Sequence, residues 1–173
     1  KPYWHHEQFL KEPPPGSTIL DIGCNNGVFL HHAEKLGYEV TGMDFNNNSL
    51  EAGRQAFGLK RLFCCTLEDF AQKFPDEKFD VITVFEVLEH LDHPNDFLEA
   101  VKSLLKPSGY IAISVPNRDM MINPLGDTDY PPHHLTKWSA LSLDNFMHVH
   151  DFTVIAHSFK QITAEDFVRW FDY

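Results

Sequence analysis

The chain has 173 residues, a length that suits one compact domain with a single core. Apolar residues make up 43% of it and charged residues 23%, close to the values of ordinary globular domains, so neither a disordered chain nor a membrane span is expected. The 14 basic and 25 acidic side chains give a formal net charge of −11, which disfavours nucleic acid and anionic membranes as main partners because both are negatively charged.

The N-terminal segment, residues 1–15, is expected to form a short helix that packs on the domain or acts as a lid over its site. Trp4 and Phe9 supply apolar side chains for this packing. A helix cannot continue through Pro13-Pro14-Pro15-Gly16, because proline lacks the amide hydrogen and clashes with the preceding turn, so this stretch is a linker. The chain begins at Lys1 rather than at a methionine, and we expect it to be a fragment or a trimmed form of a longer protein.

Strand and helix patterns alternate after the linker. Residues 18–22 are mostly aliphatic and predict a strand, and residues 28–36 predict a helix that ends at Gly37. Residues 39–44 predict the next strand, and residues 49–57 predict the next helix.

The alternation continues through the middle of the chain. Residues 62–65 predict a short strand. Residues 79–85 are a nearly continuous run of β-branched and aromatic residues, which is typical of a central strand covered on both faces. Residues 95–106 predict a helix ended by Pro107, and residues 110–115 predict the following strand.

The C-terminal part is less regular. Residues 116–138 show no periodicity and are rich in Pro, Asn, Asp and His, which predicts a long loop of the kind that is usually functional or disordered. Residues 139–148 predict a helix, and residues 152–160 predict a last strand. Residues 163–173 favour a helical segment that we expect to be cut short.

These elements predict an α/β fold with a doubly wound, mostly parallel sheet and helices on both faces. Residues 16–162 would form this domain, flanked by the N-terminal segment and the C-terminal helical segment.

The strongest motif is Ile19-Leu20-Asp21-Ile22-Gly23-Cys24-Asn25-Asn26-Gly27, a strand that runs into a glycine turn before a helix. Asp44 ends the next strand. In open α/β sheets a ligand lies at the carboxyl ends of the strands, where an acidic side chain can accept hydrogen bonds from ribose hydroxyls. The pattern therefore indicates a nucleoside site, although a glycine turn can also simply join a strand to a helix.

The details of the turn favour one nucleoside cofactor over another. A dinucleotide fingerprint requires glycine at positions held here by Asn25 and Val28, so a nicotinamide-linked dehydrogenase is disfavoured. The carboxylate of Asp21 would repel a phosphate and attract an ammonium or sulfonium group. This combination suits S-adenosylmethionine, which contains ribose and adenine but no phosphate.

Four blocks of sequence carry a resemblance to a known family: LDIGCNNG at 20–27, VTGMD at 40–44, FDVITVFEVLEHLDHP at 79–94 and LLKPSGYIAISVPN at 104–117. In order and spacing they resemble the class I S-adenosylmethionine-dependent methyltransferases, particularly the small-molecule group that includes the ubiquinone-pathway O-methyltransferases. The resemblance implies a Rossmann-like sheet and methyl transfer to an O, N or C atom of a small or medium-sized molecule, with S-adenosylhomocysteine as the product. It also implies a final antiparallel hairpin. Two explanations for its missing last strand stay open: the strand was lost by truncation, or this chain closes its sheet differently.

The resemblance further implies the roles of individual residues. The methionine part of the cofactor would be held by Asp21, Gly23, Cys24, Asn25 and Gly27. The ribose and adenine would be held by Asp44, Phe45, Thr66, Leu67 and Glu68, and the transferable methyl group would lie beside Phe85 and Glu86. Asn25 replaces a glycine that is common in the family, so the backbone or its contact with the cofactor is expected to differ there.

The acceptor side is expected to involve histidines. His133 and His134, in the long loop after Pro132, are predicted to act as a general base or to orient the substrate, because histidine titrates near neutral pH. The related O-methyltransferases use an ExxEH block in a divalent-metal site, which here would comprise Glu86, Glu89 and His90 with a loop histidine. Family members without a metal carry a similar block, so a divalent metal is not the favoured interpretation.

The remaining histidines and the cysteines are expected to be structural. His5-His6 and His31-His32 are expected on solvated helix faces. Cys24, Cys64 and Cys65 match neither a disulfide framework nor zinc spacing, which indicates a reducing, cytoplasmic setting. The adjacent pair, Cys64-Cys65, is expected to be buried packing.

Two other function classes stay open. A methyltransferase-like domain could bind the cofactor without catalysis and act as an interaction module. A metal-dependent RNA 2′-O-methyltransferase is the second alternative, and the net charge of −11 counts against it.

Overall fold

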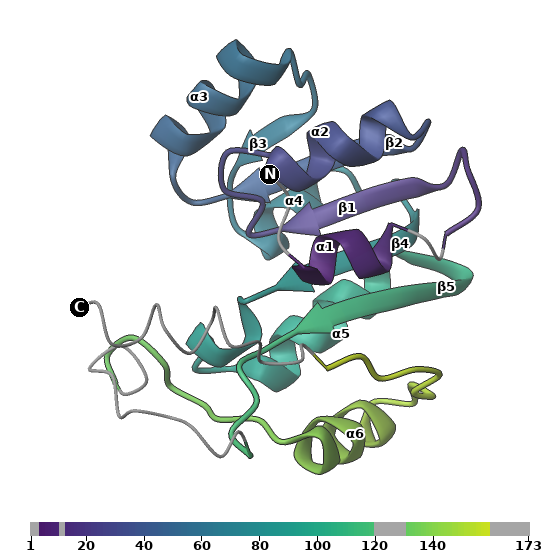
Figure 1. The fold of residues 1–173 in the computed structure, drawn as a ribbon, viewed down its shortest axis with the longest axis vertical. Helices are drawn as coiled ribbons and strands as arrows, with labels where there is room; N and C mark the ends of the chain where they lie inside the picture. Colours follow the sequence, from purple (N-terminus) through teal and green to yellow (C-terminus); the bar gives the residue numbers. More distant parts are fainter. Residues whose placement is uncertain (1–3, 11–12, 120–130, 160–173) are drawn as a thin grey trace, which may run out of the picture.

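The computed structural model describes residues 4–10, 13–119 and 131–159 (Figure 1). One parallel sheet holds five strands in the order β3-β2-β1-β4-β5. The strands are β1 (Thr18–Ile22), β2 (Glu39–Asp44), β3 (Leu62–Cys64), β4 (Phe79–Phe85) and β5 (Leu105–Ser114). The predicted doubly wound parallel sheet is confirmed.

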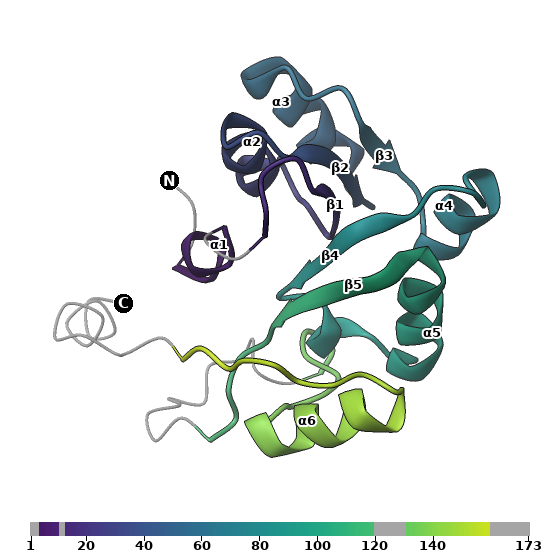
Figure 2. The ribbon, with the colours of Figure 1, turned by 90° about the vertical axis from the view of Figure 1, so that its right-hand side faces the viewer.

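Helices cover both faces of the sheet (Figure 2). The helices are α1 (Trp4–Phe9), α2 (Val28–Lys35), α3 (Asn47–Phe57), α4 (Leu67–Lys73), α5 (Pro94–Leu104) and α6 (Ala140–Val149), with a short 3₁₀ turn η1 (Leu88–His90). α1, α2 and α3 lie on one face, α4 and α5 lie on the other, and α6 lies beside α5. None of the helices in the described ranges has both the length and the apolar composition needed to cross a membrane.

Two apolar clusters form the core, one on each face of the sheet. Successive residues of a strand point to opposite faces, so Ile19 belongs to the cluster under α2 and α3, whereas Leu20 belongs to the cluster under α4 and α5. β4 lies between β1 and β5, and Val81, Ile82 and Val84 are fully buried. This confirms the predicted central position of residues 79–85.

Several element boundaries differ from the predictions for local reasons. α3 begins at Asn47 because the side chain of Asn46 caps it, accepting a hydrogen bond from the Ser49 amide at 3.2 Å. The predicted helix over residues 95–106 ends earlier, at Leu104, and β5 begins at Leu105, which pairs with Phe79. The register then shifts between Phe79 and Val81, so Pro107 lies at an irregularity within the strand. α4, which is capped by Thr66, is absent from the sequence predictions because its seven residues are too few for a clear helical period.

The prediction of a last strand over residues 152–160 is wrong for the residues that the structure describes. Residues 152–159 adopt no regular structure, and β5 pairs only with β4 among the described strands. An extended segment becomes a strand only when its backbone forms hydrogen bonds to a neighbouring strand. Residues 152–159 pair with none of the described strands. Lys160 and the predicted helix at 163–173 lie outside the described residues.

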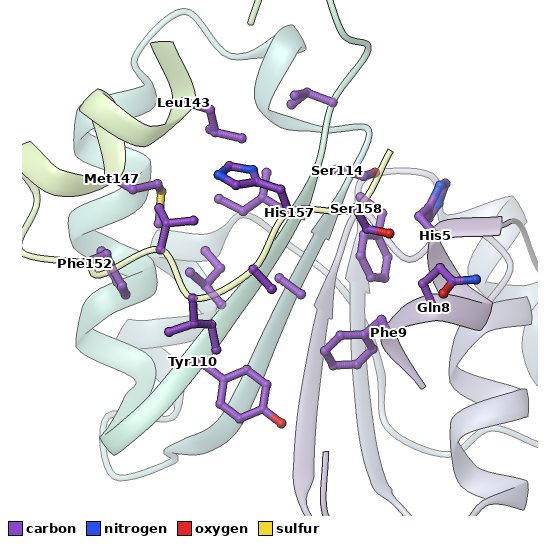
Figure 3. Close-up of a pocket in the computed structure, with 18 of the residues that line it drawn as sticks. His5, Gln8, Phe9, Tyr110, Ser114, Leu143, Met147, Phe152, His157 and Ser158 are labelled. Carbon is purple, nitrogen blue, oxygen red and sulfur yellow. The ribbon is translucent and has the colours of Figure 1, made fainter. Parts of the chain in front are cut away.

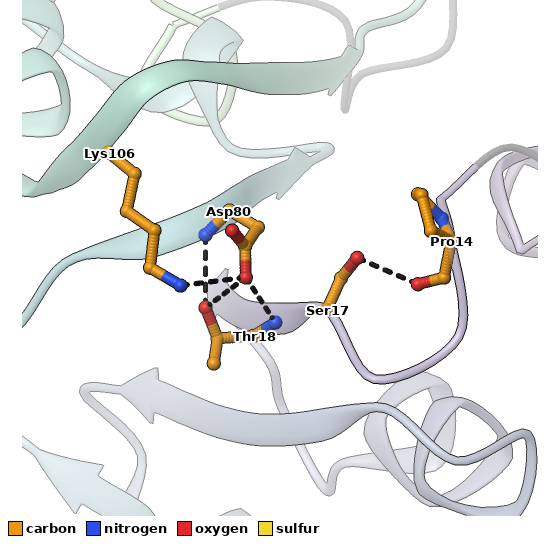
Figure 4. Close-up of polar contacts among 5 residues, drawn as sticks. All are labelled: Pro14, Ser17, Thr18, Asp80 and Lys106. Atoms are coloured by element: carbon orange, nitrogen blue, oxygen red, sulfur yellow. Dashed lines mark hydrogen bonds and ion pairs between the residues drawn. The ribbon is translucent and has the colours of Figure 1, made fainter.

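A polar cluster joins three strands at their amino ends, the edge opposite the glycine turn (Figure 4). Asp80 Oδ2 accepts hydrogen bonds from the Thr18 amide at 2.8 Å, the Thr18 hydroxyl at 2.7 Å and Lys106 Nζ at 2.9 Å. The bonds from Thr18 and Lys106 lower the pKa of Asp80 to about 2. The cluster therefore stabilises the fold above about pH 4, and this contribution is lost as the pH falls towards 2.

Candidate functional site

The glycine turn folds over the carboxyl end of β2. The amides of Gly23 and Cys24 both donate to the carbonyl oxygen of Met43, at 2.9 and 3.0 Å. Gly23 has a φ of 78°, and a Cβ atom added there would lie 2.5 Å from Val87 Cγ2. Because L-residues rarely adopt this φ and because the Cβ would overlap Val87, the position requires glycine.

Asn25 adopts a backbone conformation that glycine adopts more readily than other residues. Its φ of 50° lies in the left-handed region, which asparagine tolerates better than most residues. Its amide donates to Asp44 Oδ2 at 2.8 Å. The turn after β1 and the acid that ends β2 are therefore joined directly.

Asp44 is held by two backbone amides. Oδ2 accepts from Asn25, and Oδ1 accepts from the Asn46 amide at 2.8 Å. Each carboxylate oxygen has a further lone pair, so the side chain can still accept two ribose hydroxyls. The next residue, Phe45, is 76% exposed, an unusual state for a phenylalanine and one suited to stacking against a flat ring.

The residues predicted to border the adenine, Thr66, Leu67 and Glu68, follow β3. The Thr66 hydroxyl accepts from the Asp69 amide at 3.0 Å to cap α4, and Leu67 is buried in the core. Glu68 is exposed. Leu67 could therefore contact a cofactor only through its backbone.

Two of the cysteines behave differently from one another. Cys24 is buried, and burial raises the pKa of its thiol far above the usual range. The thiol is therefore a poor nucleophile, and Cys24 could contact a cofactor through its backbone. The prediction that Cys64-Cys65 is buried is wrong for Cys64, which is exposed because β3 is an edge strand. The Cys64 thiol donates to the carbonyl oxygen of Phe45 at 3.5 Å.

Asp21 is an acidic side chain buried beneath the turn. It is 4% exposed, and Oδ1 accepts from the Thr83 hydroxyl at 2.7 Å. Burial raises the pKa of Asp21 to about 7, and the negative charge of Asp44 acts in the same direction. A cation placed beside Asp21 would favour the ionised form.

The carboxyl ends of β4 and β5 bring Glu86 and Ser114 together. The Glu86 amide donates to the Ser114 carbonyl oxygen at 3.0 Å, and the Ser114 hydroxyl donates to Glu86 Oε1 at 2.6 Å. Glu86 has a φ of 54°, a strained conformation that these two bonds help to hold. Ser114 is missing from the sequence predictions, although its position at a strand's carboxyl end is the same signal that identified Asp44.

A groove of about 2410 Å³ runs along β5 and reaches the glycine turn (Figure 3). Its sides come from α1 on one side and from α6 with residues 151–159 on the other, and β5 forms its floor. Among the predicted site residues, the groove is lined by Asp21, Gly23, Cys24, Asn25, Phe85 and Glu86. Asp44, Phe45, Thr66, Leu67 and Glu68 lie at the ends of β2 and β3, outside the groove.

α1 borders the groove and does not carry its histidines on a solvated face. His6 is 8% exposed and packs against Phe29 and Phe85, with ring centroids 5.0 and 5.1 Å apart. His6 and Phe9 are three residues apart on one helix face, and that face is the one that packs on α2. Burial, with the neighbouring His5 and His32, lowers the pKa of His6 to about 3.

The loop histidines lie outside the groove, beside the 3₁₀ turn η1. One ligand atom from each of Glu89, His90 and His134 lies within 4.8 Å of the others. His90 Nδ1 is 2.6 Å from the carbonyl oxygen of His133, whose own side chain is exposed. Glu86 is not part of this cluster.

Glu89 is the unusual member of the cluster. It is 2% exposed, and Oε2 has no hydrogen-bond partner among the described residues. Burial raises the pKa of Glu89 to about 7. A buried carboxylate with one unpartnered oxygen, beside two imidazoles, fits a divalent cation, because nitrogen and oxygen donors of this kind bind several such ions.

A family model described as a methyltransferase domain matches residues 5–157. A ubiquinone biosynthesis O-methyltransferase of Glaesserella parasuis serovar 5 is 39% identical over 110 residues, which are 60% of this chain and 47% of that protein. The protein of the same description from Actinobacillus pleuropneumoniae serotype 7 is 37% identical over 112 residues, which are 61% of this chain and 48% of that one. The chain thus spans about half the length of these relatives.

Solved structures share the fold. A SAM-dependent methyltransferase from Archaeoglobus fulgidus superposes with a TM-score of 0.69 at 21% identity, covering 95% of this chain and 80% of that one. A glycopeptide N-methyltransferase complexed with S-adenosylmethionine gives a TM-score of 0.55 at 19% identity, covering 66% of this chain and 54% of that one. At these identities the likeness concerns the fold alone.

Proposed function

The chain belongs to the class I S-adenosylmethionine-dependent methyltransferases, and we propose that it transfers a methyl group from that cofactor to an oxygen atom of a small or medium-sized molecule. The names of the O-methyltransferase relatives support oxygen as the receiving atom. The net charge of −11 supports a small-molecule acceptor over nucleic acid. Cytoplasmic location is part of this proposal.

The bond between the Asn25 amide and Asp44 Oδ2, at 2.8 Å, is the observation that carries the proposal. It joins the place for the methionine part to the place for the ribose. Asp21, buried under the same turn, favours a positive group there and disfavours a phosphate. The site thus favours a ligand that has a ribose, carries a positive group and lacks a phosphate. S-adenosylmethionine, with its ribose and its ammonium group, meets these three conditions.

The residues of the site would act mainly by alignment. When bound, S-adenosylmethionine supplies a methyl group on a positively charged sulfur that is already a good leaving group. Asp44 would fix the ribose and Asp21 the ammonium end, which directs the intervening sulfur towards Phe85 and Glu86. Holding donor and acceptor in line and excluding water accounts for most of the rate that such a site needs to supply.

Calorimetric titration with S-adenosylhomocysteine tests whether the chain binds the cofactor. Transfer of radiolabel from S-adenosylmethionine to a panel of phenols, catechols and a short RNA tests the reaction and its acceptor. Absence of S-adenosylhomocysteine binding would overturn the proposal. Binding without transfer to any acceptor would favour the non-catalytic binding module instead.

Cofactor binding is expected to release a proton near neutral pH, because Asp21 has a pKa of about 7 in the free protein and would ionise beside the ammonium group. The affinity should therefore rise as the pH goes from about 6 to about 8. Calorimetry in buffers of different ionisation enthalpy measures this release. D21N should bind more weakly and release no proton from this position, whereas equal proton release by the two proteins would contradict the assignment.

The Glu89 cluster supports a second proposal, a divalent-cation site formed by Glu89, His90 and His134. A bound cation would supply a fixed positive charge that can orient hydroxyl groups. The predicted base or orienting role of His133 and His134 stays a proposal, and for His134 it is linked to this site.

Addition of Mn²⁺ or Zn²⁺ is expected to raise the melting temperature of the wild-type protein, and a chelator should reverse the rise. E89Q and H134A should each abolish the shift, because each loses one of three ligands. H93Q is the matched control, since His93 is a neighbouring histidine that is 77% exposed. A shift that persists in E89Q and H134A would show that the ion binds elsewhere.

A further inference from the structure

α1 holds His5 against the carboxyl end of β4. The ring of His5 lies 5.0 Å from that of Phe85 and packs edge-on against His6 at 4.4 Å, measured between centroids. His6 and Phe9 anchor the helix to Phe29, at 5.0 and 5.9 Å. These aromatic contacts fix the place of a helix that is only six residues long.

His5 faces the groove at the end nearest the glycine turn. It shares the lining with Gly23, Glu86 and Ser114. Figure 3 labels two of these lining residues, His5 and Ser114. Phe85 and Glu86 are also the residues beside which the transferable methyl group is proposed to lie. The imidazole therefore borders the space in which an acceptor atom would approach the donor.

The charges around His5 suit a proton acceptor. Burial lowers the pKa of His5, and the nearby carboxylate of Glu86 partly opposes this effect. Among the described residues, His6 also packs against His5, and its pKa of about 3 leaves that ring neutral at physiological pH. A neutral imidazole that gains a proton next to Glu86 would form a favourable ion pair.

We propose that His5 is a catalytic base that accepts the proton of the acceptor hydroxyl during methyl transfer. The inference rests on the proposed function. The acceptor oxygen forms a bond to the methyl carbon as the bond between that carbon and sulfur breaks. The hydroxyl proton passes to a ring nitrogen of His5, and the sulfonium becomes a neutral thioether, so charge and atoms balance.

The geometry favours His5 over the loop histidines for this role. His133 and His134 do not line the groove, and His90 interacts with both. Glu86 lines the groove, but its Oε1 already accepts a hydrogen bond from the Ser114 hydroxyl at 2.6 Å. Glu86 then has a supporting role, stabilising the imidazolium.

H5F and H5Q separate proton transfer from packing, since phenylalanine keeps a ring against Phe85 and glutamine keeps a polar group, but neither accepts the proton. With the phenol from the panel that accepts label fastest, both variants should lower kcat about 100-fold. The dissociation constant for S-adenosylhomocysteine should change less than about twofold. The wild-type rate should fall as the pH drops through the pKa of His5, and this limb should be absent from both variants.

A chromogenic phenol tests the proton transfer without turnover. In the presence of S-adenosylhomocysteine, 4-nitrophenol at a pH where the free probe is mostly neutral should show added phenolate absorbance with the wild-type protein. H5F and H5Q should lose this absorbance, and H93Q, with a histidine that is 77% exposed, should retain it.

The outcomes separate this inference from the proposed function. If the wild-type protein does not bind S-adenosylhomocysteine, the proposed function fails and the inference fails with it. If it binds, and 4-nitrophenol gives the same spectrum with the wild-type protein, H5F and H5Q, only the role of His5 is overturned. Loss of the signal in H134A but not in H5F would assign the proton transfer to the loop histidine instead.

Discussion

Replacement of Gly23 by alanine is expected to abolish cofactor binding and to lower the free energy of unfolding by about 3 kcal/mol. Part of the cost is the φ of 78°, which an L-residue adopts with strain. The rest is the approach of the new Cβ to Val87 Cγ2, at 2.5 Å, which forces the turn or the start of η1 to move. A displacement of about 1 Å in a binding site lowers affinity or rate by about 100-fold, so S-adenosylhomocysteine titration should show a loss of at least this size.

Two further variants isolate the cause of the G23A effect. G37A introduces an alanine at a φ of 89° where no atom lies within 4 Å of the added Cβ, so it should lose about 1–2 kcal/mol of stability and bind the cofactor normally. G23A/V87A removes the overlap and should recover part of both losses. Normal binding by G23A alone would contradict the assignment of this turn to the cofactor.

D44A is expected to weaken S-adenosylhomocysteine binding by about 100-fold. The side chain is proposed to accept the ribose hydroxyls, and hydrogen bonds to a charged group contribute about 1.5–3 kcal/mol each. The substitution also frees the amides of Asn25 and Asn46, both of which donate to this carboxylate at 2.8 Å. D44N should lose nearly as much affinity for S-adenosylhomocysteine, because the new side-chain amide nitrogen would face the backbone amide of Asn25 or Asn46, and two donors cannot bond to each other.

D76A is the matched control for D44A, because Asp76 is an exposed acid away from the site and its loss changes the net charge equally. Calorimetric titration of the three variants measures the difference. Wild-type affinity in D44A would place the ribose elsewhere and would remove the main support for the proposed function.

Local patterns predicted most of the sheet. The ranges 18–22, 39–44 and 79–85 match β1, β2 and β4, because each is a short stretch with β-branched residues between clear turn signals. Asp21, Gly23, Asn25 and Asp44 lie within a few residues of strand ends, and parallel strands bring their carboxyl ends to one edge. Their roles toward a cofactor stay predictions.

Contacts between distant segments could not be predicted in this way. His6 was expected in solvent, but Phe29 and Phe85 bury it. Residues 152–159 have the pattern of a strand but pair with no strand in the described part of the chain. In both cases the deciding interaction is made with another segment, about which the local pattern carries no information.

The sequence by itself determined the alternation of strands and helices from β1 to β5, except for α4. It also determined the glycine turn with its neighbouring acids and the resemblance to a methyltransferase family, because these depend on residues close together in the chain. The tertiary structure decided which side chains share a space. It placed His5 at the groove with Glu86 and Ser114, and it placed the loop histidines beside Glu89 instead. The physical reason is that burial and electrostatic environment arise only when segments far apart in sequence pack together, and these set the protonation of Asp21, His6 and Glu89.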